Sequence, residues 1–279
     1  MNALYRFVKE SNPIVFSILA ALTTVSLVPF VWVIVSAFKD NTEIFGSMSF
    51  FPKQWQVENF KEAWVGGNFS MFFRNTLLVA IATTVISVAV AAPAGYAFAK
   101  TPLRRIPALF YLYLFGITLP LESIVVPLFY QMKSLGLVNS LWGLILAMVG
   151  TGVPFGVYLM RSFFRDLPDA LAESARIDGA SEWEIFFRIM MPLAKPGLLA
   201  LGVFSFLGAW NEFLLSILLL ISESKRTIPI GLLRFQQDNM SQYGPLFAAI
   251  TLAMIPSILV YVVLQRQFIS GLALGATKG

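Results

Sequence analysis

Side chains that could do chemistry are scarce in this chain and gather in one stretch, residues 161–192. The chain has 20 basic and 15 acidic residues but no cysteine and no histidine. Thiol nucleophiles, histidine acid–base pairs, disulfides and ordinary zinc sites are therefore excluded. The charged residues of the stretch are Asp166, Asp169, Glu173, Asp178, Glu182, Glu184, Arg161, Arg165, Arg176 and Arg188. With no nucleophile or base beside them, these charges indicate contact with another protein rather than catalysis, and no metal site is expected.

The local pattern predicts two short helices that meet at a glycine. Pro168 suits a first helical turn, where its missing N–H costs nothing. Gly179 can adopt positive φ and is a natural stop past the last turn. Ser181 followed by Glu184 forms a capping box that restarts the helix. An apolar stripe at helical spacing follows, made of Trp183, Phe186, Phe187 and Met190, before Pro192 and Pro196 interrupt the pattern.

This segment resembles the EAA loop of permease subunits in bacterial ABC importers. That motif runs Glu-Ala-Ala, then Asp-Gly-Ala, then an isoleucine and a leucine before a closing proline. The matching residues here are Glu173, Ser174, Ala175, Asp178, Gly179, Ala180, Ile189 and Pro192. Ser174 and Met191 depart from the alanine and leucine of the motif. The resemblance implies a cytoplasmic coupling loop over residues 161–195, seated in a groove of an ATPase. Glu173 would face a basic residue there, and the stripe with Trp183, Phe186 and Phe187 would be buried against the groove.

Long apolar segments make up most of the remaining sequence. Hydrophobic residues are 57% of the 279 residues, charged residues are 13%, and the mean hydropathy is +0.75; soluble domains are about one quarter charged. Segments of about 20 apolar residues can cross a bilayer. Six are expected, at about 13–38, 76–98, 107–130, 141–159, 197–219 and 244–264. We therefore predict an all-α integral membrane protein with a single transmembrane domain over residues 1–279. Kinks without breaks are expected at Pro120, Pro127 and Pro154.

Basic residues near the span ends predict the orientation of the chain. With the N-terminus inside, twelve Lys and Arg residues flank the inner ends and eight flank the outer ends. This bias places both termini and residues 161–195 in the cytoplasm. The first apolar run is long enough to span and lacks a small-residue cleavage site, so no cleavable signal is expected. The net charge of +5 is spread along the span ends and does not predict nucleic-acid binding.

The likeness to permeases extends over nearly the whole chain. Ser36–Lys39, Glu43–Phe45 and Glu58–Phe60 resemble the first outer loop of the carbohydrate-importing branch, and Gly275–Gly279 resembles its closing motif. The layout is similar to the six-span permease of the maltose-type importer, which implies the type I ABC importer permease fold. It also implies a second homologous permease, an ATPase homodimer, an extracytoplasmic solute-binding protein and a bacterial inner membrane. ATP and Mg²⁺ would be bound by the ATPase, with no cofactor and no enzymatic activity in this chain.

Two further groups of polar residues are candidates for contact with a solute. Trp210, Asn211 and Glu212 lie in the fifth span, where a carboxylate is costly and indicates function. They could line a pathway for a sugar, or Glu212 could pair with a neighbouring subunit near the outer interface. The polar run Gln236, Gln237, Asp238 and Asn239 lies between spans five and six. In the related maltose permease, a loop at this place reaches into the docked binding protein; an ordinary hydrated loop is the alternative.

A secondary transporter or channel subunit for a small polar solute is the main alternative function. It would be expected to show charge pairs or an ion site within the spans, and it would not need the two-helix motif. A membrane-embedded enzyme is disfavoured because no acid, base, nucleophile or metal set is clustered. The sequence thus predicts a permease subunit of an ATP-driven importer for a carbohydrate or related solute, and leaves the solute unnamed.

Overall fold

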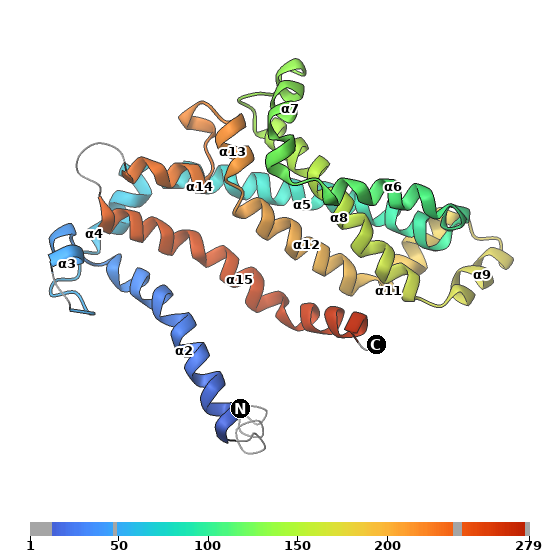
Figure 1. Cartoon of the computed structure of the whole chain (residues 1–279), viewed down its shortest axis with the longest axis horizontal. Coiled ribbons are helices and arrows are strands. Elements are labelled where there is room, and N and C mark those ends of the chain that lie inside the picture. Colours follow the sequence, from blue (N-terminus) through green and yellow to red (C-terminus); the bar gives the residue numbers. More distant parts are fainter. Residues whose placement is uncertain (1–12, 47–48, 237–241, 277–279) are drawn as a thin grey trace. The chain divides into compact units, whose positions relative to one another are not determined.

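The structure, a computed structural model, describes residues 13–46, 49–236 and 242–276, with side-chain surroundings described as far as residue 263. Every regular element in these ranges is helical (Figure 1). The chain divides into two compact units. One comprises Met1–Phe69 with Leu232–Met254, and the other comprises Ser70–Gly231 with Ile255–Gly279. The second unit contains the predicted coupling loop and Glu212.

Four helices of the described chain are long and apolar enough to cross a membrane. They are α2 (Pro13–Ser36), α5 (Phe69–Lys100), α8 (Leu141–Asp166) and α15 (Tyr243–Ala276), the last tested over Tyr243–Val263. Two bent helix pairs raise the number to six when each counts as one span. These are α6 (Pro107–Thr118) with α7 (Leu121–Ser134), and Glu182–Leu193 with α12 (Lys195–Trp210). The predicted all-α membrane architecture is therefore confirmed, with four to six apolar crossings in the described chain.

The third and fifth predicted spans are wrong in detail, because the structure breaks both. α6 and α7 meet at a bend of 95°. Leu119 there is extended, with ψ 116°, since a residue before proline is disfavoured in the α region, and Pro120 cannot continue the helix. Pro127 and Pro154 lie inside α7 and α8 without a break, as expected. In the fifth span, α12 ends at Trp210 and α13 (Leu214–Leu219) resumes after a short gap.

The first unit is organised by three polar residues of the outer-loop motif. The Asn59 amide donates to the carbonyls of Ala37 and Lys39, at 2.9 Å each. Lys39 Nζ donates to Ser49 O at 2.6 Å, and Glu43 Oε1 accepts from the Lys53 amide at 2.6 Å. The elements that they join are α3 (Asn41–Gly46), α4 (Glu58–Lys61) and the π-helical turn η1 (Glu62–Gly66). These motif residues thus have a structural role, which is to close the loop after α2.

The second unit is built around α8, which packs against α6, α7, α12 and α13. Glycines allow the close crossing of α5 and α8. A Cβ on Gly95 would lie 2.6 Å from Met160 Cβ, and one on Gly156 would lie 2.9 Å from Ala91 Cβ. Small residues at such crossings are typical of membrane helices. α5 also contains Pro93, midway between these contacts. The crossing places α5, α8 and α12 around one volume.

The remaining elements of the described chain are short. They are the 3₁₀ turns η2 (Pro102–Arg105), η4 (Glu223–Lys225) and η5 (Leu232–Gln236), the helices α9 (Asp169–Ile177), α10 (Glu182–Glu184), α11 (Met191–Leu193) and α14 (Ile228–Gly231), and the π-helical turn η3 (Ile185–Met190). Of these, α9 to α11 with η3 form the segment that the sequence singled out.

Candidate functional site

Residues 161–195, hereafter the helix–glycine–helix segment, fold as the local sequence predicted. Gly179 follows α9 with φ +84°, a left-handed conformation that favours glycine. Ser181 Oγ accepts from the Glu184 amide at 3.3 Å, and Glu184 Oε2 accepts from the Ser181 amide at 3.0 Å. The glycine turn and the capping box are therefore confirmed. Pro168 differs slightly: it is the N-cap of α9, with ψ 129°, and not part of the first turn.

A buried lysine fixes the start of α9 to the end of α5. The side chain of Lys100 is only 2% exposed, and its Nζ lies 2.6 Å from Asp169 Oδ1. Lys100 also donates to the carbonyl of Leu167, and Arg104 Nη1 lies 2.8 Å from Asp169 Oδ2. The hydrogen bond from Lys100, followed by that from Arg104, lowers the pKa of Asp169. A cation buried this deeply is costly without its partner, so this pair ties α9 to α5.

A second set of contacts ties both short helices to α5. Glu182 Oε2 accepts from the Tyr96 hydroxyl at 2.8 Å, and Glu182 Oε1 accepts from Arg176 Nε at 2.6 Å. Arg176 Nη2 also donates to the Lys100 carbonyl at 3.4 Å. Tyr96 and Lys100 belong to α5, Arg176 to α9 and Glu182 to α10. The ends of three helices are thereby held together by charge-assisted hydrogen bonds, which are stronger than neutral ones.

The apolar stripe after the glycine divides between two environments. Phe186 and Met190 are buried in the chain itself, and the Phe186 ring lies 5.3 Å from that of Tyr96. Trp183 is 65% exposed and Phe187 is 56% exposed, and the two rings stack with centroids 5.9 Å apart. The structure thus assigns Phe186 to the core of the second unit, whereas the sequence predicted that the whole stripe would face a partner. Only Trp183 and Phe187 of this stripe are open to a second protein.

Ile177 adds a third exposed apolar side chain that the sequence reasoning missed. It is 86% exposed at the end of α9, whereas Ala172 and Ala175 are buried. A position two residues after Ala175 faces away from it on a helix, which is the signal that was available in the sequence. The other predicted contact residues vary in exposure. Glu173, Ser174, Asp178, Gly179 and Pro192 are exposed, and Ala180 and Ile189 are half-buried.

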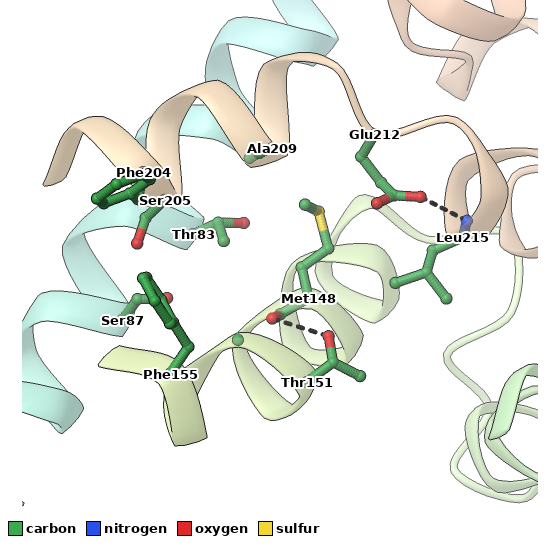
Figure 2. Close-up of a pocket in the computed structure, with 12 residues that line it drawn as sticks. Thr83, Ser87, Met148, Thr151, Phe155, Phe204, Ser205, Ala209, Glu212 and Leu215 are labelled. Atoms are coloured by element: carbon green, nitrogen blue, oxygen red, sulfur yellow. Dashed lines mark hydrogen bonds between the residues drawn. The ribbon is translucent and has the colours of Figure 1, made fainter. Parts of the chain in front are cut away.

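A cavity of about 300 Å³ lies between α5, α8, α12 and the start of α13 (Figure 2). Its lining residues are Thr83, Ser87, Met148, Thr151, Gly152, Phe155, Phe204, Ser205, Gly208, Ala209, Glu212 and Leu215. The rings of Phe155 and Phe204 meet edge to face, with centroids 5.5 Å apart. Four hydroxyls, one carboxylate and two aromatic rings thus converge on one volume, which lies at the lower end of the ~300–1,000 Å³ of small-molecule sites.

Of the three residues predicted to line a pathway, only Glu212 lines this cavity. Trp210 is buried and stacks on Phe206, with ring centroids 5.7 Å apart. The Asn211 amide donates back to Leu207 O at 2.8 Å. Glu212 lies in the gap between α12 and α13, and its Oε1 accepts from the Leu215 amide at 2.7 Å. The break in the fifth span therefore positions this carboxylate beside the cavity.

The hydroxyls of the cavity were not found from the sequence. Thr83 and Ser87 are four residues apart on α5 and therefore share one face, a signal that a search for charged residues passes over. Within the described ranges, no group of three His, Cys, Asp or Glu side chains could hold a metal ion. In the predicted loop after α14, Gln236 ends η5, while Gln237, Asp238 and Asn239 lie outside the described residues.

Comparison with known proteins agrees with this architecture. Residues 91–273 match the family described as "Binding-protein-dependent transport system inner membrane component". The chain is 36% identical to the diacetylchitobiose uptake system permease protein NgcG of Streptomyces coelicolor, over 94% of this chain and 87% of the relative. It is 30% identical to the arabinooligosaccharides transport system permease protein AraQ of Halalkalibacterium halodurans, over 97% of this chain and 99% of the relative.

A solved structure shares the fold. A chain in the crystal structure of a bacterial ABC transporter involved in the import of the acidic polysaccharide alginate superposes with a TM-score of 0.82. The two chains are 23% identical, and the match covers 92% of this chain and 96% of that one. The family match covers more than half of the sequence, and two relatives match nearly all of it. This chain therefore belongs to the binding-protein-dependent transport system inner membrane components and is a non-enzymatic permease subunit of an ABC importer.

Proposed function

We propose that this permease subunit imports a saccharide and is driven by an ATPase that docks on the helix–glycine–helix segment. The observation that carries the docking site is the exposed apolar surface of Ile177, Trp183 and Phe187 on a segment that is bound to α5. Exposed aromatic residues are typical anchors of protein interfaces. Glu173, Ser174 and Asp178 add exposed polar groups around this surface.

Docking at this segment would move α5 without any chemistry in the chain. A displacement of α9 and α10 acts on Asp169 and Glu182, and these carboxylates pull on Lys100 and Tyr96 at the end of α5. α5 also supplies Thr83 and Ser87 to the cavity. Closure of the ATPase would therefore change the surroundings of the cavity through one helix. Rigid-body coupling of this kind needs an interface with two discrete arrangements.

The proposed assembly contains four further polypeptides and one membrane. It comprises a second homologous permease, an ATPase homodimer that binds ATP and Mg²⁺, and an extracytoplasmic solute-binding protein. The excess of Lys and Arg at the inner span ends supports a bacterial inner membrane location with both termini in the cytoplasm. Gln236, Gln237, Asp238 and Asn239 are proposed to reach the binding protein. Neither a cofactor nor nucleic acid is assigned to this chain.

The substrate class follows from two independent observations. The relatives NgcG and AraQ are named for diacetylchitobiose and arabinooligosaccharides. The cavity combines hydroxyls, a carboxylate and the rings of Phe155 and Phe204, a set that suits the apolar faces and hydroxyl groups of a sugar. Both support a saccharide cargo.

Two variants of the exposed turn test the docking proposal. Gly179→Pro cannot adopt φ +84°, and Glu173→Lys reverses an exposed charge. Both should leave the chain in the membrane and reduce ATPase co-purification and solute uptake at least 10-fold. Glu122→Lys, which reverses an exposed charge in α7, is the matched control and should behave as the unmodified chain. Normal transport by both variants would contradict the docking site.

A catalytically inactive ATPase tests the importer itself. Uptake into cells or vesicles should stop when the ATPase that co-purifies with this chain cannot hydrolyse ATP. Uptake that continues would favour the secondary transporter or channel alternative.

A further inference from the structure

Thr83 presents a buried hydroxyl with no partner at the wall of the cavity. The residue is 3% exposed, and its Oγ1 is buried without a hydrogen bond within the described chain. Buried polar groups are nearly always paired, and an unpaired one costs free energy. In Figure 2 this hydroxyl lies within the ring of lining side chains. The position therefore retains a donor and acceptor that a bound ligand could satisfy.

Glu212 contributes a second unused group to the same wall. Its Oε1 accepts from the Leu215 amide at 2.7 Å, which secures the side chain. Its Oε2 has no hydrogen-bond partner among the described residues and lies on the side of Met148 in Figure 2. A fixed carboxylate with one free oxygen is a strong acceptor for a ligand hydroxyl.

The other lining residues offer hydroxyl acceptors and apolar faces. Thr151 donates its proton to Ala147 O at 3.0 Å within α8, which leaves its lone pairs available. Ser87 and Ser205 add two more hydroxyls on α5 and α12. Phe155 and Phe204 supply aromatic surface beside them. Since one water occupies ~30 Å³ in the liquid, the cavity of about 300 Å³ has room for a single sugar ring.

The charge of the lining discriminates between classes of sugar. Glu212 is the one ionisable residue among the lining residues, and no Lys or Arg is present. The carboxylate of a uronic acid, or the sulfonate of a sulfonated sugar, would find no cation in this cavity and would lie near the Glu212 carboxylate. Like charges repel strongly where few waters screen them, and unpaired like charges are an effective way to reject a ligand.

We propose that this cavity is a transit site for one uncharged sugar ring and that Glu212 rejects acidic saccharides there. The proposal rests on the proposed function and adds to it a site in this subunit and a charge selectivity. Glu212 accepts hydrogen bonds from ring hydroxyls, and Thr83 can both donate to them and accept from them. Phe155 and Phe204 contact the C–H faces of the ring. The solute-binding protein remains the first point of selection, and this cavity is a second one.

Cysteine protection in the assembled transporter tests the site directly. The chain contains no cysteine, so Ser205→Cys places a single thiol of this subunit in the cavity, and Ser134→Cys places one on the exposed surface of α7. Labelling with N-ethylmaleimide in membrane vesicles is followed by mass spectrometry of this chain. ATP-driven uptake by the same vesicles is measured first, for a panel of uncharged oligosaccharides and for the acidic disaccharide digalacturonate. This measurement identifies which of these sugars the transporter imports.

The expected result is selective protection. An imported uncharged sugar should slow labelling of Ser205→Cys at least 5-fold, and digalacturonate at the same concentration should not. Labelling of Ser134→Cys should be unaffected by either. Import of acidic sugars alone, or equal protection by digalacturonate, would overturn the charge selectivity. Full labelling of Ser205→Cys in the presence of an imported sugar would overturn the site while leaving the proposed function intact.

Two outcomes separate the remaining explanations. Uptake of no saccharide at all would contradict the proposed function itself. Labelling of Ser205→Cys that is blocked in the assembled transporter without sugar, but rapid in the isolated chain, would show that a neighbouring subunit fills the cavity, and would overturn the proposal.

Two conservative variants identify the groups that act. Glu212→Gln keeps an oxygen to accept from the Leu215 amide but removes the charge, so digalacturonate should now protect Ser205→Cys. Thr83→Val keeps the shape of the side chain and removes the unpaired hydroxyl, so protection by the uncharged sugar should weaken at least 3-fold. Unchanged protection in both variants would overturn the assigned roles.

Discussion

The helix–glycine–helix segment and the cavity use polar groups in opposite ways. In the segment, Asp169 and Glu182 each accept hydrogen bonds from two different side chains. In the cavity, the Thr83 hydroxyl and one oxygen of Glu212 have no partner within the described chain. Satisfied polar groups stabilise a joint between elements, whereas unsatisfied ones are available to a ligand. The difference fits the proposed roles, in which the segment transmits the motion of the ATPase and the cavity binds the solute.

The two regions share α5. Thr83 and Ser87 line the cavity, and Tyr96 and Lys100 bind the segment. Thr83 and Tyr96 are thirteen residues apart, which is about 20 Å along a helix at 1.5 Å per residue. One continuous element thus carries both kinds of polar group, and variants in α5 can test each kind separately.

The largest effect is expected where the segment is open to a partner. Replacing Trp183 and Phe187 together by aspartate should reduce the ATPase recovered with the detergent-solubilised chain about 100-fold, because interface anchors are worth ~2 kcal/mol or more. Both side chains are exposed, so the fold should persist. Phe187→Tyr is the matched control and should retain the ATPase. Undiminished recovery in the double variant would remove the docking role from this surface.

The next largest effect is expected at Asp169, whose carboxylate pairs with both Lys100 and Arg104. Lys100→Met removes a side chain that is 2% exposed, whereas Arg104→Gln removes one that is 43% exposed. We expect Lys100→Met to weaken the attachment of α9 by about 1–3 kcal/mol and Arg104→Gln by less than ~1 kcal/mol. Hydrogen exchange of the amides of Asp169–Ile177 measures both. Equal losses would show that burial of Lys100 does not strengthen the joint.

A pH titration should also report on the contact between Asp169 and Lys100. The pKa of Asp169 lies below its ordinary value of 3.8, chiefly because of the hydrogen bond from Lys100. A carboxyl with a lowered pKa stabilises the folded state above its ordinary pKa and loses that contribution as the pH falls through its folded value. Exchange protection of α9 should therefore be constant down to about pH 5 and decline only below the ordinary value. In Asp169→Asn, the exchange protection of α9 should decline less at low pH. An identical decline in this variant would show that other titrating groups cause the loss of protection.

The smallest effect is expected in the cavity, where a matched pair on α5 gives the contrast. Thr76 is fully buried, donates to Phe72 O and accepts from the Ile228 amide, both at 2.8 Å. Thr76→Val should therefore destabilise the chain by about 1–3 kcal/mol. Thr83→Val removes an unpaired hydroxyl and should therefore not lower stability. Thermal unfolding of the solubilised chain compares the two, and a comparable loss in both would mean that Thr83 is satisfied in the folded protein.

Local chemistry made the helix–glycine–helix segment predictable from the sequence. Gly179 and the Ser181–Glu184 capping box each specify a backbone conformation within a few residues, and composition alone specifies the apolar crossings. The break at Pro120 was predicted only as a kink, because neighbouring helices decide whether a membrane proline bends or ends a helix.

Contacts between residues far apart in the chain could not be predicted from the sequence. Lys100 and Asp169 are 69 residues apart, and nothing near Lys100 marks it as the partner of α9. Thr83 and Ser87 carry no charge, so they resemble the many hydroxyls that satisfy their own helix. The division of the stripe, with Phe186 inside and Phe187 outside, depends on the position of α5 and α8, which a helical pattern does not contain.

Pro93 makes α5 easier to bend at a point between the cavity and the end that binds the segment. Proline has no amide hydrogen, so the helical hydrogen bond that would end on the Ala89 carbonyl is missing between the cavity and the attached end. Ten residues separate Pro93 from Thr83, a lever arm of about 15 Å. A tilt of about 10° at such a proline would sweep Thr83 through about 3 Å. A small rotation at the segment would thereby move Thr83 relative to α8 and α12, and so change the lining of the proposed sugar site.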